Sequence, residues 1–208
     1  MSRTSHTSPT SRTNAVQFAD FSVKPVLTGG KAVLRPFTEA DAEVIAEIVE
    51  DPEVIRFTFE PDTVITMEQL RSWYGSRSAQ TDRLDLAVTD RATGELVGEV
   101  VLYEWNPAAR SCTFRTLLGP SGRGRGLGTE ATRLIVAYGF EQLGLHRIEL
   151  QAYAHNHRAL RVYEKVGFVV EGVRREVQLR DGEWADEVLM AILDHEWAAG
   201  AGVSATAR

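Results

Sequence analysis

Apolar residues follow strand-like and helix-like spacings in turn along this chain, and the changes between them mark a series of short elements. The segments with strand character are residues 32–35, 84–89, 96–105, 111–118, 146–154, 168–179 and 184–193. Apolar residues at helical spacing occur from Thr38 to Asp51, and over residues 66–76, 127–143 and 156–166. This order, βα(α)βββ and then αβαββ, predicts an α+β fold with a mixed sheet.

Residues that favour turns and helix ends stand at the boundaries of these segments. Thr38 suits the N-cap of a helix, with an acidic residue three positions further on, and Asp51-Pro52 is expected to end that helix. Asn156 suits the N-cap of a later helix, and Gly144 suits the left-handed residue after the central helix. Asp181-Gly182 predicts a tight hairpin between the last two strands.

Composition and charge narrow the class of protein. The 208 residues, 43% hydrophobic and 25% charged, suit one globular domain. A net charge of −6 argues against nucleic acid as the main partner. No apolar run approaches the length of a membrane span and no secretory signal is present, so a cytoplasmic protein without a membrane partner is expected. Cys112 is the only cysteine, which excludes a disulfide framework and a thiolate zinc site.

Both ends of the chain are expected to lie outside the folded domain. The first thirteen residues are mostly Ser, Thr and Arg and cannot bury enough apolar area to become ordered. We therefore expect a disordered tail and lead-in over residues 1–30, one domain over 31–196, and a flexible tail over 197–208.

The stretch from Pro120 to Glu130, P-S-G-R-G-R-G-L-G-T-E, has glycine at every second position from 122 to 128 and opens the central helix. Glycines let backbone N–H groups approach a ligand, and the first helical turn adds unpaired donors and partial positive charge. This arrangement predicts a phosphate or pyrophosphate site. The stretch matches neither G-x-G-x-x-G nor the P-loop, which requires a lysine. A flexible turn before an ordinary helix is the alternative.

Several motifs in a fixed order carry a family resemblance. Arg123, Gly126 and Gly128 form R-x-x-G-x-G, which resembles the acetyl-CoA pyrophosphate loop of the GCN5-related N-acetyltransferase (GNAT) superfamily. The other motifs are V-L-R-P-F-T-E-A-D at 33–41, H-R-I-E-L-Q-A-Y-A at 146–154, Y-E-K-V-G-F at 163–168, E-G-V-R-R-E at 171–176 and D-G-E-W-x-D-E at 181–187. Over residues 31–196 the chain resembles the RimJ/RimL-like branch and is also similar to the spermidine acetyltransferases.

The resemblance implies a single domain whose mixed, mostly antiparallel sheet splays apart at the acetyl-CoA site, with helices on both faces. It implies acetyl-CoA as donor and, as acceptor, a primary amine of a small molecule (a polyamine, antibiotic or metabolite) or of a protein N-terminus. It also implies that homodimers are common in the branch. The residues that it assigns to acetyl-CoA are Thr116 and Leu117 for pantetheine, Arg123, Gly124, Arg125, Gly126, Leu127, Gly128 and Thr129 for pyrophosphate, and Asn156.

The resemblance implies a general acid for this chain but leaves the general base without a matching residue. Tyr163 matches the general acid that protonates the coenzyme A thiolate, although it also fills the apolar stripe of its helix. Gln151 stands where some relatives have a glutamate base, and an amide cannot accept the proton. Glu60 and Glu104 are the preferred acceptor contacts, with Glu99 and Glu149 as further carboxylates, each of which is also a candidate for a solvated surface charge.

Two other readings stay open, and a metal site is not expected. His155 and His157 flank Asn156, but H-x-H without further ligands is a poor metal site. A non-catalytic acyl-CoA-binding sensor or interaction module would keep the glycine-rich turn and tolerate loss of Tyr163. A phosphate-binding α/β enzyme unrelated to acetyl transfer would bind nucleotides but not coenzyme A.

Overall fold

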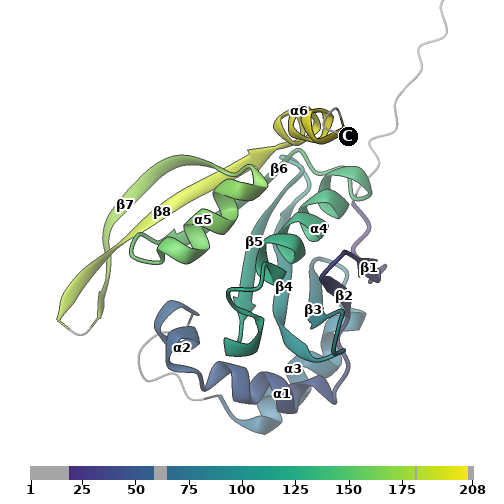
Figure 1. The fold of residues 1–208 in the computed structure, drawn as a ribbon, viewed down its shortest axis with the longest axis vertical. Helices are drawn as coiled ribbons and strands as arrows, with labels where there is room; N and C mark the ends of the chain where they lie inside the picture. The colour runs from purple at the N-terminus through teal and green to yellow at the C-terminus, as the bar shows by residue number, and fades with distance from the viewer. Residues whose placement is uncertain (1–18, 59–64, 181, 206–208) are drawn as a thin grey trace, which may run out of the picture.

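A computed structural model describes residues 19–58, 65–180 and 182–205 (Figure 1). Eight strands form one sheet in the order β1-β2-β3-β4-β5-β6-β8-β7. Their bounds are β1 Leu27–Thr28, β2 Ala32–Pro36, β3 Leu84–Asp90, β4 Leu96–Asn106, β5 Ser111–Leu118, β6 Arg147–Tyr153, β7 Val169–Arg180 and β8 Glu183–Leu193. Neighbouring strands are antiparallel except β5 and β6, which are parallel, so the predicted mixed and mostly antiparallel sheet is confirmed.

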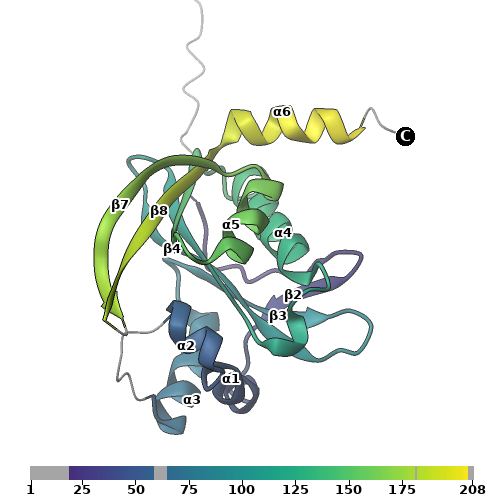
Figure 2. The same cartoon turned by 60° about the vertical axis from the view of Figure 1, so that its left-hand side comes forward.

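Helices cover both faces of this sheet (Figures 1 and 2). The α-helices of the described segments are α1 Asp41–Val49, α2 Pro52–Thr58, α3 Met67–Ser76, α4 Leu127–Glu141, α5 His157–Val166 and α6 Asp194–Ala205. Alternate strand residues point to opposite faces. Phe114 therefore packs in the core beneath α4 and α5, whereas Leu117 packs in a second core with α1, α2 and α3.

The sheet opens between its two parallel strands. The β5–β6 ladder has only three pairs, of which the last joins Thr113 and Glu149. Beyond that pair, β5 continues to Leu118 and β6 to Tyr153 without pairing with each other. The predicted splay of the sheet is confirmed, and it leaves unpaired backbone on the inner edges of both strands.

Folded structure extends beyond both of the expected boundaries. Phe21 is buried and packs on Trp105, with 5.6 Å between ring centroids, so the lead-in belongs to the core. At the other end α6 continues to Ala205, where the sequence predicts a flexible tail from residue 197. The Trp197 ring lies 6.1 Å from that of Phe140, centroid to centroid, and its indole N–H donates a hydrogen bond to Glu141 Oε1 at 3.1 Å. Contacts to distant segments stabilise both ends, and local composition does not reveal them.

The helices before β3 also differ from the sequence prediction. Asp51-Pro52 follows the end of α1 as predicted, but a further helix, α2, begins at Pro52, because proline is tolerated in a first helical turn and Asp51 accepts a hydrogen bond from the Val54 amide at 3.1 Å. Thr38 is not the N-cap of α1, which is Ala40; the Thr38 amide instead donates to the Asp41 carboxylate at 2.8 Å. No helix among the described residues has the length and apolar composition needed to cross a bilayer.

Candidate active site

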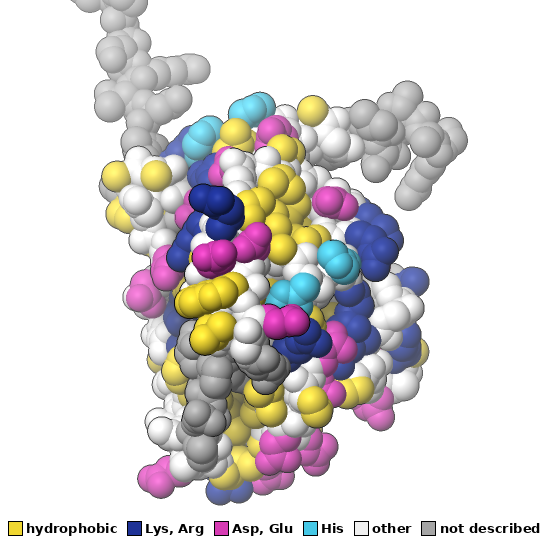
Figure 3. Space-filling model, turned by 90° about the vertical axis from the view of Figure 1, so that its left-hand side faces the viewer, with side chains coloured by type: hydrophobic (Ala, Val, Ile, Leu, Met, Phe, Trp, Pro, Cys, Tyr) yellow, Lys and Arg dark blue, Asp and Glu magenta, His cyan; other side chains and the backbone are white. Residues whose placement is uncertain are grey.

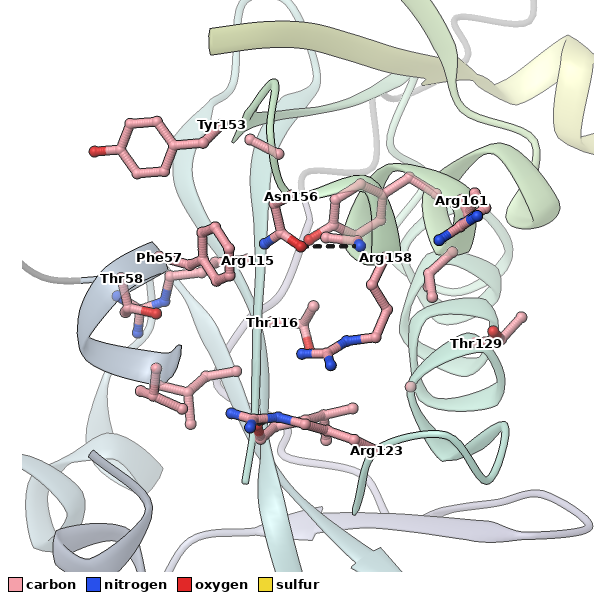
Figure 4. A pocket seen from close by; sticks show the side chains of 18 of the residues that line it. Phe57, Thr58, Arg115, Thr116, Arg123, Thr129, Tyr153, Asn156, Arg158 and Arg161 are labelled. Carbon is pink, nitrogen blue, oxygen red and sulfur yellow. Dashed lines mark hydrogen bonds between the residues drawn. The ribbon is translucent and has the colours of Figure 1, made fainter. Parts of the chain in front are cut away.

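A cavity of about 560 Å³ lies where β5 and β6 part (Figure 4). Its wall is built from α2, β4, β5, the glycine-rich turn, β6, α5 and β8. Side chains of both charges line it, and the cationic ones are in the majority. The basic lining residues are Arg115, Arg123, Arg158, Arg161 and Lys165, and the acidic ones are Glu53 and Glu187. Lys and Arg side chains also gather along one flank of the surface (Figure 3).

The glycine-rich turn presents backbone donors at one end of this cavity. Gly124 and Gly126 have φ angles of 71° and 86°, a left-handed conformation that favours glycine, and Gly126 is the N-cap of α4. The Glu130 amide donates to the Gly126 carbonyl at 3.1 Å. Within the described part of the chain, none of the amides of residues 124–129 donates a hydrogen bond. Free amides at a helix N-terminus are suited to bind a phosphate or pyrophosphate group.

Side chains of the turn and of the first turn of α4 fasten the loop to the sheet. Glu130 accepts hydrogen bonds from the amides of Gly30, Lys31 and Ala32 at 2.9, 2.6 and 2.6 Å. Arg125 pairs with Asp90 on the side of the loop away from the cavity. The Leu127 side chain is buried in the core. Residues 125 and 127 can therefore contribute to an anion site through their backbone only.

The Arg123 side chain is likewise engaged in hydrogen bonds to other residues of the protein. Its guanidinium donates to the Leu118 carbonyl at 2.9 Å, to Asp51 at 2.6 Å and to Glu53 at 3.3 Å. Arg158 of α5 reaches the same Glu53. Glu53 thus joins α2 to the turn and to α5 across the mouth of the cavity.

The inner edge of β5 offers a second kind of contact. On its outer side β5 is paired with β4 as far as Leu118, and the Thr116 hydroxyl donates to the Glu99 carbonyl at 3.0 Å. On its inner side the backbone of Thr116 and Leu117 has no strand partner, because the ladder with β6 has already ended. An extended ligand can add to this edge as a strand would.

Asn156, the N-cap of α5, and Tyr163, within α5, both line the cavity. Asn156 Oδ1 accepts a hydrogen bond from the Ala159 amide at 3.2 Å, so it caps α5 as predicted, and its Nδ2 points away from the helix (Figure 4). The Tyr163 side chain is only 6% exposed, and its ring packs edge-on against Phe114 at 6.0 Å. Burial raises the pKa of the Tyr163 phenol, which therefore stays protonated at neutral pH.

The protein family that this architecture belongs to is shown by comparison with known proteins. The model of the acetyltransferase (GNAT) domain matches residues 31–169, which is most of the chain. The chain belongs to the GNAT acetyltransferase family. It is a GNAT-family N-acetyltransferase, and the sheet opening, the glycine-rich turn and α4 all lie within the matched segment.

Relatives and solved structures agree with this assignment. The chain is 29% identical over 166 residues to spermidine N(1)-acetyltransferase of Escherichia coli K12, a match that covers 80% of this chain and 88% of that protein. Its fold is similar to Vibrio cholerae spermidine N-acetyltransferase in complex with CoA and spermine (TM-score 0.74, 26% identity, 82% and 99% coverage). It is also similar to a GNAT-family acetyltransferase of Bacillus anthracis (TM-score 0.71, 25% identity, 82% and 99% coverage).

Of the two preferred acceptor contacts, only Glu104 belongs to the described residues of this GNAT enzyme. Glu60 lies outside the described residues. Glu104 is exposed at a bulge of β4, has a φ of 56° and accepts a hydrogen bond from the Thr113 hydroxyl at 2.7 Å. It does not line the cavity, because it lies beside Thr113, on the part of β5 that is still paired with β6.

Two features of the wall are missed by sequence reasoning. The first is a buried cluster in which Glu99, 1% exposed, accepts hydrogen bonds from Tyr74 at 2.9 Å and from Arg115 at 2.7 Å. These partners satisfy Glu99, which the sequence offers as a free carboxylate. The second is Glu187 of β8. It stands in the hairpin motif D-G-E-W-x-D-E, but only the pairing of β6 with β8 places it at the cavity.

Proposed function

We propose that this N-acetyltransferase transfers the acetyl group of acetyl-CoA directly to a primary amine of a small molecule or of a peptide N-terminus. The observation that carries the proposal is the row of amides at residues 124–129, which have no acceptor among the described residues, beside the open edge of β5 in one cavity. A pyrophosphate and an extended pantetheine arm need these two features next to each other.

In the donor half, the amides of the turn and the N-terminus of α4 hold the pyrophosphate. The cations of α5 that face the cavity, Arg158, Arg161 and Lys165, add favourable charge for the phosphates of the donor. The backbone at Thr116 and Leu117 pairs with the pantetheine arm, and the free Nδ2 of Asn156 donates to it from the opposite side. The thioester then lies between β5 and α5, beside Tyr163.

The chemical step needs a neutral amine and a protonated leaving group. The amine nitrogen attacks the thioester carbon, and Tyr163 gives its phenolic proton to the departing sulfur. Burial keeps that phenol protonated over the physiological range of pH. The coenzyme A and spermine complex of the Vibrio cholerae relative supports a small amine as acceptor, as does the likeness to the Escherichia coli spermidine enzyme.

A thiol-release assay tests the function. Acetyl-CoA is incubated with the protein and with polyamines, aminoglycosides, amino acids or short peptides, and free coenzyme A is measured. We expect release that depends on one class of amine, with the acetylated amine found by mass spectrometry. Binding of coenzyme A without release in any arm would instead support the non-catalytic acyl-CoA-binding module.

A further inference from the structure

The acceptor half of the cavity has a wall on β6 and β8. In the ladder of these strands Tyr153 is opposite Glu187, and Gln151 is opposite Leu189. The intervening pair, Ala152 and Val188, packs into the core beneath α5. Tyr153, Gln151 and Glu187 therefore share the other face of the sheet, and all three line the cavity.

Aromatic and cationic side chains form the facing wall. Phe57 and Thr58 of α2 and Arg115 of β5 lie together on one side of the pocket, while Arg158 and Arg161 lie on the donor side (Figure 4). Tyr103 of β4 lies beside Arg115, with 6.0 Å between the guanidinium carbon and the ring centroid. Burial is the main cause that raises the Tyr103 pKa, and the charges of Glu104 and Glu187 act in the same direction.

Glu187 retains unused hydrogen-bonding capacity. Its side chain is 13% exposed, its Oε2 is buried, and neither carboxylate oxygen accepts a hydrogen bond within the described part of the chain. Arg174 Nη1 lies 2.9 Å from Oε2 but is not directed at it as a hydrogen-bond donor, and that guanidinium is 55% exposed. Because the arginine partner is mostly exposed to water and is not aimed at the carboxylate, we expect this ion pair to be weak.

The other carboxylates of this region are already engaged. Glu99 accepts hydrogen bonds from Tyr74 and Arg115, and Glu53 pairs with Arg123 and Arg158. A buried anionic oxygen without a donor is costly, so a ligand that brings N–H groups to Glu187 is favoured. A protonated primary amine has three such groups and a compensating charge.

We propose that Glu187 binds the ammonium group of the acceptor and takes its first proton, and so is a catalytic residue of the acetyl transfer proposed above. The inference rests on that proposed function. Gln151, on the same face, cannot accept a proton, whereas the Glu187 carboxylate on the neighbouring strand can. Tyr103 and Tyr153 line the same cavity, and aromatic side chains suit a cationic group because aromatic faces attract cations.

The protons and bonds of this step balance. Glu187 takes one proton from the ammonium, which leaves a neutral amine. The amine nitrogen forms a bond to the thioester carbon, the C–S bond breaks, and the sulfur leaves with the electron pair. Tyr163 gives its proton to the sulfur and regains one from the nitrogen, and Glu187 releases its proton to water. One ammonium and one thioester thus yield one amide, one thiol and one proton.

The test compares Glu187→Gln with the wild type over a range of pH, using the amine found in the thiol-release assay. We expect kcat/KM at neutral pH to fall by about 10²–10⁴. In the variant only the neutral amine in solution can react, so its kcat/KM should rise by about tenfold per pH unit up to the pKa of the amine. Calorimetry with coenzyme A and the melting temperature should be unchanged.

Two matched variants separate this role from a structural one. Glu183→Gln removes an exposed carboxylate from the same strand, and Arg174→Gln removes the ion-pair partner of Glu187. Both should keep kcat/KM within a few-fold of wild type. An unchanged pH profile in Glu187→Gln, or an equal loss in Arg174→Gln, overturns the proposal while the acetyltransferase function stands. A wild-type chain that binds no coenzyme A and releases no thiol overturns both.

Discussion

The guanidinium of Arg123 lies 2.6 Å from the carboxylate of Asp51, so the arginine of the glycine-rich turn connects that turn to α2. Both side chains are largely buried, and Arg123 also donates to the Leu118 carbonyl. The arginine of the R-x-x-G-x-G motif thus positions two walls of the cavity relative to each other. The backbone of the turn is left to bind the ligand.

Replacing Arg123 should lower the free energy of unfolding at neutral pH and make it vary less as the pH falls. The hydrogen bond from Arg123 is the main cause that lowers the Asp51 pKa. A lowered folded-state pKa adds stability above the unfolded value of about 3.9, and this stability is lost as pH falls through the folded value. Arg123→Gln should therefore cost about 1–3 kcal/mol at neutral pH, as expected for a hydrogen bond to a charged group.

Urea unfolding at several pH values checks this prediction. The difference between wild type and Arg123→Gln should shrink as pH falls below about 4. Arg161→Gln is the control, because Arg161 is exposed and makes no hydrogen bond or ion pair within the described residues. It should change stability by less than about 0.5 kcal/mol. If the difference in free energy of unfolding between wild type and Arg123→Gln stayed constant with pH, the stabilising role of the Arg123–Asp51 pair would be contradicted.

Alanine substitutions at two glycines of similar backbone conformation distinguish the effect of backbone strain from an effect on ligand binding. Gly124 has a φ of 71° and Gly144 has a φ of 65°, and an added Cβ would meet nothing within 4 Å at either position. Gly124 lines the cavity and Gly144 does not. Alanine should cost about 1–2 kcal/mol of stability at each, from left-handed strain.

Only Gly124→Ala should also weaken the binding of coenzyme A. We expect its Kd to rise by about tenfold or more, because the added methyl group would stand where the ligand approaches the backbone. Calorimetry measures the affinity and urea unfolding the stability. Equal affinity losses in the two variants would mean that the turn acts through stability alone.

Asn156 is predicted to have two separable roles. Its Oδ1 caps α5 through the Ala159 amide, and its Nδ2 is free to donate to the donor substrate. Serine caps helices as well as asparagine does, so Asn156→Ser should keep stability within about 0.5 kcal/mol. Asn156→Ala should cost about 1 kcal/mol.

Both substitutions at Asn156 should raise the KM for acetyl-CoA by about tenfold, the value of one hydrogen bond. Steady-state kinetics and thermal unfolding of the two variants provide the measurements. A normal KM in Asn156→Ser would restrict Asn156 to its capping role.

Tyr163→Phe tests the general acid. Turnover should fall by about 10²–10⁴ while coenzyme A affinity and melting temperature stay unchanged. Tyr138→Phe is the matched control, because Tyr138 packs against the same core from α4 and does not line the cavity. Since burial raises the Tyr163 pKa, wild-type activity should not decline through phenol ionisation up to about pH 10. Normal turnover in Tyr163→Phe would remove this residue from the mechanism.

Features set by local sequence were predictable. The αL glycine at 144, the Asn156 cap and the turn that opens α4 depend on residues within one or two turns of chain, and the structure confirms them. The succession along the chain of strands β2 to β8 also followed from periodicity, whereas β1 was not predicted. The roles given to Tyr163, to Asn156 and to the turn in binding acetyl-CoA remain predictions, because they concern a ligand.

Features set by distant contacts were not predictable. Phe21 is buried through its contact with the ring of Trp105. The last helix, α6, is held against the domain by the contact between Trp197 and Phe140. Glu104 has the expected sequence position, but a bulge directs it to Thr113. Glu187 reaches the cavity through the β6–β8 register, which no local pattern encodes.

The most direct test of the account is a titration of coenzyme A into the ¹⁵N-labelled protein, followed by amide NMR. The amides of residues 124–129 and those of Thr116 and Leu117 should shift together and saturate, because both groups bind one molecule. The amide of Gly144, which is outside the cavity, should stay in place. If millimolar coenzyme A leaves residues 124–129 unmoved, the cavity is not the donor site.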